Sequence, residues 1–332
     1  MPPSAAKMPA KRIRPAKFAP LLNCAPCNGP VQFRRRGGRG RARVAIVLAS
    51  VALVAGCGLQ FGSDSGPVTL TITRNFGAVP LASTVGRVRA GVSAVALLKR
   101  HFKVLLGAQG SVLSIGGTAA ATGERWRLYV NGVAAGERTG VHPGERLWWD
   151  LNDASSQSPA VVGAYPQPFL GGLGGRRLPV TVECGGDVRA ACARVMAALT
   201  RLHVPAASQV LGVASGTDSL TIVVGTWQDI RQEVAGSLLE QGPSSSGVFA
   251  RFSGPGGGSI QLLRSDGAAS ATLHGEAGLI AAMTQGNSPP TWLITGTGPA
   301  AVGTAADAFS TDPLRDHFAL AISDGREIAV PR

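Results

Sequence analysis

Trp126-Arg-Leu-Tyr-Val-Asn-Gly-Val133 contains the strongest hairpin signal in the chain. Asn131 and Gly132 both tolerate the positive φ angles that a type I′ turn requires, and apolar residues flank them on both sides. Short strands are expected at residues 112–115, 126–130 and 146–151. The sequence therefore predicts a β-rich unit around this hairpin.

Residues 68–73, upstream of the hairpin, alternate between apolar residues and threonine. This period of two predicts a half-buried strand. Ser93 can cap a helix over residues 94–101, because its side-chain oxygen can accept a hydrogen bond from an amide of the first turn. The apolar face of this helix would carry Val95, Leu98 and Phe102.

Three motifs in this region carry a resemblance to a known family. They are Asn75-Phe76-Gly77, the segment 126–133 and Pro143-Gly-Glu-Arg-Leu-Trp-Trp-Asp150. Together they resemble the transcobalamin-like C-terminal domain of bacterial exported proteins, a small domain of unknown function similar to the β-domain of vitamin B12 carriers. The resemblance covers residues 68–152 and implies a β-grasp-like fold. It alone implies a corrinoid ligand, whereas the residues themselves indicate no cofactor.

Residues 44–56 form an apolar run that follows a cluster of arginines and ends at Cys57. As a helix this run would span roughly 20 Å, which is less than the hydrocarbon core of about 30 Å but suits a signal peptide. Val54-Ala-Gly-Cys57 resembles the bacterial lipobox. The resemblance implies cleavage before Cys57 and acylation of its thiol, which would anchor the protein on the outer face of the cytoplasmic membrane. An uncleaved transmembrane helix and an ordinary cleaved signal are the alternatives.

The net charge of +13 is concentrated before the apolar run. Residues 1–43 contain 11 of the 32 Lys and Arg residues and no Asp or Glu, so from Cys57 onward 21 basic residues face 19 acidic ones. This near balance argues against nucleic acid as a partner. The basic leader instead orients the signal peptide. Because the leader is longer than a signal needs, translation from Val31 is an alternative to a start at Met1.

Two cysteines, Cys184 and Cys192, remain as a pair once Cys57 is assigned to the lipid. The outer face of a membrane permits a disulfide between them, which would stabilise the fold by roughly 2 to 3 kcal/mol. Two buried thiols are the alternative. Cys24 and Cys27 have neither a second pair nor a histidine partner, so no zinc site is expected there.

Changes of composition along the chain predict six segments. They are a basic disordered leader (1–43), a signal h-region with the lipobox (44–56), a Gly/Ser spacer (57–67), the transcobalamin-like domain (68–152), a Gly/Pro-rich linker (153–177) and an α/β domain (178–332). The glycines and prolines of 153–177 exclude a regular element, which is why we place the domain boundary there. The predicted fold class is therefore α+β.

The α/β domain contains a candidate repeat, 178–253 and 259–323, in which each copy would be a βαβαβ unit. The first copy would have strands at 179–184, 220–225 and 248–252 and helices at 188–202 and 229–239. The second would have strands at 260–263, 292–296 and 318–322 and helices at 276–283 and 300–309. Thr226 and Thr297 would cap the second helix of each copy. Chance likeness between α/β units is the alternative to duplication.

Aromatic and polar side chains gather on two neighbouring strands and the loop after them. The predicted ligand-binding residues are Trp126, Tyr129, Asn131, Trp148, Trp149, Asp150 and Tyr165. Adjacent tryptophans point to opposite faces of a strand, so we expect one in the core and the other exposed or half exposed. The exposed ring would offer a stacking surface to a flat or sugar-like ligand. Packing of both rings under the loops is the alternative.

Signatures of an enzyme are missing from the sequence. The five histidines lack the i, i+4 spacing of a zinc helix, no G-x-S-x-G motif occurs, and no close pair of carboxylates lies in an apolar setting. We therefore expect no catalytic residue and no metal site.

Taken together, these features predict a lipid-anchored extracytoplasmic protein that binds or presents a ligand, as an accessory to cofactor or metal uptake. Its partners would be the lipid bilayer, reached through Cys57, and an unknown small molecule or envelope protein. A non-catalytic envelope protein-interaction module is the first alternative, and an envelope hydrolase is the second.

Overall fold

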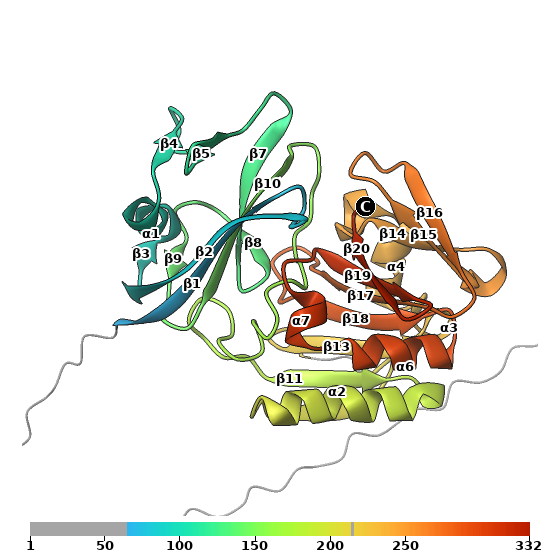
Figure 1. The fold of residues 1–332 in the computed structure, drawn as a ribbon. Helices are drawn as coiled ribbons and strands as arrows, with labels where there is room; N and C mark the ends of the chain where they lie inside the picture. Colours follow the sequence, from blue (N-terminus) through green and yellow to red (C-terminus); the bar gives the residue numbers. More distant parts are fainter. Residues whose placement is uncertain (1–64, 214–215) are drawn as a thin grey trace, which may run out of the picture. The chain divides into compact units, whose positions relative to one another are not determined.

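Strand β10 (Arg146–Asp153) is the central strand of a five-stranded sheet with the order β2-β1-β10-β7-β8 (Figure 1). The other strands are β1 (Ser65–Arg74), β2 (Val79–Arg89), β7 (Glu124–Val130) and β8 (Val133–Ala135). β1 runs parallel to β10, and the remaining pairs are antiparallel. The structure is a computed structural model that describes residues 65–213 and 216–332.

Contacts divide the chain into two units, Met1–Gln60 and Phe61–Arg332, and every element named below belongs to the second unit. The predicted leader, signal peptide, lipidated Cys57 and residues 57–64 of the spacer lie outside the described residues. The last three residues of the predicted spacer, 65–67, are strand instead, because they pair with residues 87–89 of β2.

The hairpin between β7 and β8 forms as the sequence predicts. Asn131 and Gly132 have φ angles of 51° and 82°, and Val130 faces Val133 across the turn. Both turn residues therefore adopt the left-handed region that a type I′ turn requires.

One face of the five-stranded sheet is covered by helix α1 (Ala94–His101) and by short strands. The helix has the predicted bounds, and the Ser93 hydroxyl accepts a hydrogen bond from the Ala96 amide. The short strands are β3 (Val92–Ser93), β4 (Val104–Leu106), β5 (Val112–Ile115), β6 (Thr118–Ala119) and β9 (Gly140–Val141). Leu70, Leu98 and Trp149 are buried together in the core between these layers.

The second half of the unit is built on a seven-stranded sheet with the order β12-β11-β13-β18-β17-β19-β20. Its strands are β11 (Val180–Cys184), β12 (Ala206–Val210), β13 (Leu220–Thr226), β17 (Ala277–Met283), β18 (Thr291–Gly296), β19 (Ala319–Ser323) and β20 (Arg326–Val330). The strands from β12 to β18 are parallel, while β17, β19 and β20 are antiparallel to their neighbours. The class is therefore α+β and β-rich.

Helices α2 (Arg189–Arg201) and α6 (Pro299–Asp307) cover one face of this sheet, as Figure 1 shows. The other face carries a small sheet of β14 (Ala250–Ser253), β15 (Ser259–Leu263) and β16 (Ala269–His274). Short helices complete the half: η1 (Gly186–Val188), α3 (Trp227–Ile230), α4 (Val234–Glu240), α5 (Pro243–Ser246), η2 (Pro255–Gly257) and α7 (Thr311–Leu314). Thr226 caps α3 as expected, in a capping box with Asp229.

The predicted helix at 276–283 is wrong, because these residues form strand β17. All seven residues of β17 are buried, since neighbouring strands flank it and both faces of the sheet are covered. A strand buried on both faces loses the alternation that would distinguish it from a buried helix. The predicted helix at 229–239 is also divided into α3 and α4. The two βαβαβ units are therefore not formed as predicted, and β14 and β19 lie in different sheets.

Within the predicted linker, 153–177, residue 153 ends β10 and residues 154–177 contain no helix or strand. They are nevertheless packed, because Tyr165 and Phe169 are buried against Trp292 and Phe309 of the α/β half. The sulfur atoms of Cys184 and Cys192 lie at bonding distance, with Cα atoms 6.1 Å apart. Across the described ranges, no helix combines the length and the apolar character that crossing a membrane requires.

Candidate functional site

An aromatic cluster joins the five-stranded sheet to the α/β half of the unit. It consists of Phe76, Tyr129, Trp148, Phe249 and Phe318. The ring centroid of Phe318 lies 5.1 Å from that of Phe76, 5.3 Å from that of Tyr129 and 5.2 Å from that of Trp148. All three are edge-to-face contacts. Edge-to-face pairs place the positive ring edge on a negative ring face and are favourable beyond simple burial. The cluster therefore covers a sheet face that the sequence pattern predicted to be half exposed.

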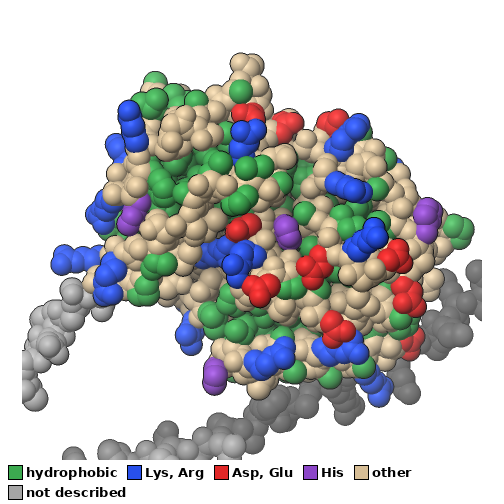
Figure 2. Space-filling view, in the orientation of Figure 1, with side chains coloured by type: hydrophobic (Ala, Val, Ile, Leu, Met, Phe, Trp, Pro, Cys, Tyr) green, Lys and Arg blue, Asp and Glu red, His purple; other side chains and the backbone are tan. Residues whose placement is uncertain are grey.

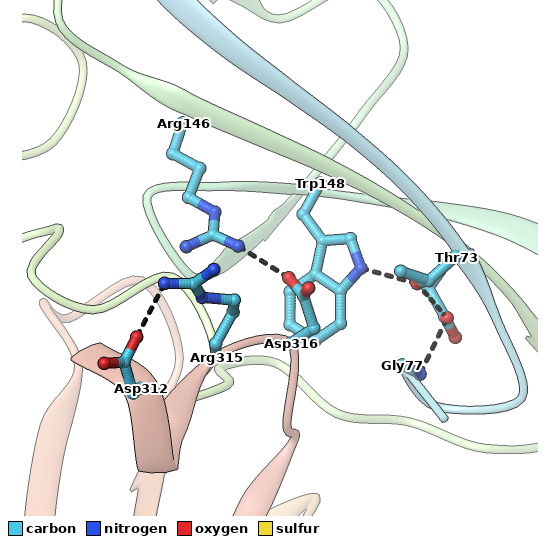
Figure 3. A network of polar contacts seen from close by, with 8 residues as sticks. Thr73, Gly77, Arg146, Trp148, Asp312, Arg315 and Asp316 are labelled. Atoms are coloured by element: carbon cyan, nitrogen blue, oxygen red, sulfur yellow. Dashed lines mark hydrogen bonds and ion pairs between the residues drawn. The ribbon is translucent and has the colours of Figure 1, made fainter. Parts of the chain in front are cut away.

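The carboxylate of Asp150 is buried beside this cluster and accepts four hydrogen bonds. The Thr73 hydroxyl donates at 2.5 Å, the Gly77 amide at 2.9 Å, the Asn152 side-chain amide at 2.9 Å and the Phe76 amide at 3.1 Å. Thr73 also accepts a hydrogen bond of 2.7 Å from the Trp148 indole (Figure 3). Thr73 is fully buried, so strand β1 is not the half-buried strand that alternation with threonine predicts.

Burial raises the pKa of Asp150, and the four hydrogen bonds oppose this rise. Two of the donors are the amides of residues 76 and 77, in the turn between β1 and β2. Asn75, Phe76 and Gly77 have positive φ angles of 57°, 57° and 84°, so the turn has an unfavourable backbone that external partners must stabilise. The fully buried carboxylate of Asp150 stabilises this turn by accepting hydrogen bonds from the amides of Phe76 and Gly77. This position suits support of the turn rather than contact with a substrate.

An ion pair crosses between the halves beside the aromatic cluster. The Arg146 guanidinium donates to Asp316 at 2.6 Å, and the two side chains are only 15% and 20% exposed. Burial lowers the pKa of Arg146, while the charge of Asp316 opposes this shift. Arg315 and Asp312 form a second pair nearby at 2.7 Å, but these side chains are 57% and 89% exposed (Figure 3).

The predicted ligand-binding residues are divided among three buried environments. Tyr129, Trp148 and Asp150 belong to the face that meets the α/β half, whereas Trp126 and Trp149 lie in the core of the five-stranded sheet. The two adjacent tryptophans do point to opposite faces. However, both are 0% exposed, so the expectation of an exposed tryptophan is wrong.

The remaining two predicted residues also have structural contacts. Asn131 donates to the Gly172 carbonyl at 2.7 Å and accepts from the Arg146 amide at 2.8 Å, so it ties the hairpin turn to a loop and to β10. The ring of Tyr165 packs against Phe309, with ring centroids 4.8 Å apart, and lies outside the aromatic cluster. A ligand-binding role for these seven residues stays a prediction. Contact of a ligand with the buried Tyr129 or Trp148 would require the seam between the halves to open.

Four neighbouring hollows lie along or beside this seam. The hollow around Trp126 is lined only by residues of the five-stranded half, and the other three are also lined by residues of the α/β half. The volumes of the four hollows are 360, 440, 360 and 420 Å³. Neighbouring hollows share lining residues: Arg125, Arg127 and Ala134 between the first and second, Gln157 and Ser244 between the second and third, and Ser265 between the third and fourth. We call this series the seam groove.

The second hollow of the seam groove has two arginines on its β7 side and hydroxyl groups on its α5 side. Arg125 and Arg127 are two residues apart on β7, so both point to the same face of the sheet. Ser244 and Ser245 line the hollow from α5. These arginines were not among the predicted ligand-binding residues, although their i, i+2 spacing next to the hairpin turn was a usable signal.

Two further surface features lie outside the seam groove. A hollow of 330 Å³ in the α/β half is lined by Glu183, Glu233 and several hydroxyl residues. Figure 2 shows hydrophobic side chains exposed over the part of the molecule that holds β4 and β5, where Leu105 and Leu113 are exposed. Within the described part of the chain, no group of three or more His, Cys, Asp or Glu residues could hold a metal ion.

Comparisons with known proteins add little to this geometry. No family model matches the chain, and no match was found among the curated proteins. Among solved structures, one of a Ruminococcus gnavus protein to which metal binding has been ascribed matches 27% of this chain and 98% of its own chain, at 13% identity and a TM-score of 0.21.

Proposed function

We propose that this protein is a lipid-anchored extracytoplasmic binding protein that holds a small-molecule ligand in the seam groove. The observation that carries the proposal is the row of four neighbouring hollows, each of which shares at least one lining residue with the next. Each hollow has the volume of a small-ligand site, and sites of this kind occur preferentially where two structural layers or domains meet.

The contacts on either side of the groove support binding rather than catalysis. Asp150, the buried carboxylate with a raised pKa, is fully occupied by donors from the chain itself. A general acid or base must reach the proton that it transfers, and Asp150 is 0% exposed. The residues that line the groove include arginines, serines and a few acidic residues, and this polar lining suits recognition of a polar ligand.

The proposal also includes a lipid anchor at Cys57, a transcobalamin-like origin of the five-stranded half and a duplication within the α/β half. The lipobox-like Val54-Ala-Gly-Cys57 supports acylation at Cys57 and placement on the outer membrane face. The motifs in 68–152 support a transcobalamin-like origin for the five-stranded half. The similar spacing of β13 and β18 from their following helices supports a duplication that has since diverged. Ligand capture for an uptake system would follow from the anchor and the groove together.

The anchor is tested by mass spectrometry of the exported protein. We expect a mature N-terminus at Cys57 that carries a diacylglyceryl thioether, and we expect Cys57→Ala to abolish incorporation of a labelled fatty acid. Cys184→Ala serves as the matched control, because it removes a cysteine outside the lipobox. An unmodified thiol at Cys57, or a start downstream of it, would overturn the anchor.

Ligand binding is tested with the full chain in mild detergent. A panel of organic acids, phosphate esters, sugars and cyanocobalamin is screened for a saturable rise in melting temperature, because a ligand that binds only the folded state stabilises it. Trp126 lines the first hollow, so binding there should also change tryptophan fluorescence. A panel that gives no saturable response by either measurement would argue for a protein that contacts only other macromolecules.

A further inference from the structure

The second hollow of the seam groove combines two positive charges with several hydrogen-bond donors in a space of 440 Å³. Arg125 and Arg127 line one side of it, and Ser244 and Ser245 line the other. No Asp or Glu is among the described residues that line this hollow. The charge inside it is therefore positive and is not neutralised by its own walls.

Arg127 is held in place by neutral acceptors. Its Nε donates to the Asn152 side-chain oxygen at 2.9 Å, and its Nη2 donates to backbone carbonyls of Asp153, Ala154 and Ser156. None of these four contacts is to a carboxylate. The guanidinium is thus fixed in orientation while its charge remains available to a ligand, which is the kind of preorganisation that a binding site needs.

Arg125 is exposed, and within residues 65–213 and 216–332 its guanidinium forms no ion pair or hydrogen bond. It lies near enough to Arg127 for the two charges to interact. Burial and the neighbouring Arg125 lower the pKa of Arg127, while Asp153 and Asp150 oppose the shift from outside the hollow. Two like charges that face one hollow repel each other, and an anion between them would relieve that repulsion.

We propose that this hollow binds an oxyanion, a phosphate or carboxylate group, between Arg125, Arg127 and the hydroxyls of Ser244 and Ser245. Guanidinium groups match both oxyanions in geometry and form charge-assisted hydrogen bonds with them. The volume exceeds that of a bare phosphate, so the rest of a small ligand can extend into the adjoining hollows. This assignment rests on the proposed function and names the chemical class of its ligand.

Isothermal titration of the full chain in mild detergent with inorganic phosphate and with citrate tests the proposal. We expect saturable binding of at least one of the two probes, and Arg125→Gln should weaken it roughly tenfold or more, because a charge-assisted contact is lost. Arg138→Gln is the matched control, since Arg138 is exposed, has the same charge and does not line the hollow. Ser244→Ala should weaken binding by a smaller factor.

Vesicles identify the source of the oxyanion. Binding to phosphatidylglycerol vesicles that depends on Arg125, together with weak binding of the soluble probes, would identify a lipid headgroup. Equal weakening by Arg125→Gln and Arg138→Gln, or no binding of phosphate, citrate or vesicles, would overturn the oxyanion site. If a neutral compound from the ligand panel still stabilised the protein in that case, the proposed binding function would survive and only the ligand class would be wrong.

Discussion

Gly77 approaches Asp316 so closely that a Cβ atom at Gly77 would lie 1.7 Å from the backbone carbonyl oxygen of Asp316. Gly77 belongs to the turn after β1, whereas Asp316 precedes β19 in the other half. Asp316 also accepts the hydrogen bond of Arg146, and Gly77 donates to Asp150. The two halves are therefore joined by backbone contact, by an ion pair and by the aromatic cluster within a small region.

Replacing Gly77 with alanine should destabilise the protein strongly. The φ angle of 84° is unfavourable for an L-residue, at a cost of about 1 to 2 kcal/mol. The overlap with the Asp316 carbonyl adds to this cost, because backbone cannot move aside as a flexible side chain can. We expect urea unfolding of Gly77→Ala to show a loss of free energy clearly above the conformational cost alone.

Gly91→Ala provides the matched control for this loss. Gly91 has a similar φ of 86°, but no atom outside its immediate chain neighbours lies within 4 Å of the place that a Cβ atom would take there. Its replacement should therefore cost only about 1 to 2 kcal/mol. Equal losses of free energy for the two variants would mean that the contact between Gly77 and Asp316 does not form in solution.

The ion pair between Arg146 and Asp316 should contribute more than a surface pair of the same length. A double-mutant cycle with Arg146→Met and Asp316→Asn removes the charges while keeping most of the side-chain volume. Because both side chains are largely buried, we expect a coupling free energy of about 1 to 3 kcal/mol. The measurement is the free energy of unfolding of the two single variants, the double variant and the unmodified protein.

The exposed pair of Arg315 and Asp312 is the control cycle. Its distance of 2.7 Å nearly equals the 2.6 Å of the buried pair, but solvent surrounds it. Exposed pairs contribute about 0 to 1 kcal/mol, so its coupling should be the smaller one. Comparable coupling in both cycles would contradict the view that the halves are held together by a partly buried charge pair.

Local structure in this protein was largely predictable from local chemistry. Ser93 begins α1 because its hydroxyl accepts an amide hydrogen bond, and Asn131-Gly132 forms the turn because both residues accept positive φ. These outcomes depend on a few adjacent residues. Strand β17 was not predictable in this way, since an apolar run buried on both faces has no period that distinguishes strand from helix.

Exposure was harder to predict than secondary structure, because it depends on residues far away in the sequence. The sequence places Trp148 and Trp149 on opposite faces of β10, and this is confirmed. Whether the outer face is open depends on Phe318, which lies 170 residues after Trp148 and packs against it at 5.2 Å. The same reason explains why the arginines of the second hollow were missed, since Ser244 and Ser245 come from the other half.

Acidification should destabilise the protein through His317. Burial lowers the pKa of His317 from its usual value of 6.5, and the charges of Asp316 and Glu327 oppose the shift. The unfolded chain therefore binds a proton more readily than the folded one. The contribution to stability is fully present above pH 6.5 and is lost as the pH falls from there toward the lowered pKa of the folded state.

The measurement is the free energy of unfolding as a function of pH below neutrality. His317→Gln should show a weaker decline in this range than the unmodified protein. His274→Gln is the control, because His274 is exposed on β16, and this variant should follow the unmodified protein. A decline that is the same in all three proteins would assign the pH dependence to other groups.

The disulfide between Cys184 and Cys192 should contribute measurably to the thermal stability of the protein. The bond joins residues eight positions apart, from the end of β11 into α2, and it restricts the unfolded chain more than the folded one. A loop of this length corresponds to roughly 2 to 3 kcal/mol, and to a fall in melting temperature of roughly 4 to 10 °C for a unit of this size. We expect Cys184→Ser to show this fall when it is compared with oxidised, unmodified protein by calorimetry. Cys192→Ser should match it, and a reductant should lower the melting temperature of the unmodified protein without affecting either variant. A melting temperature that neither substitution nor reductant changes would show that the two thiols are not bonded.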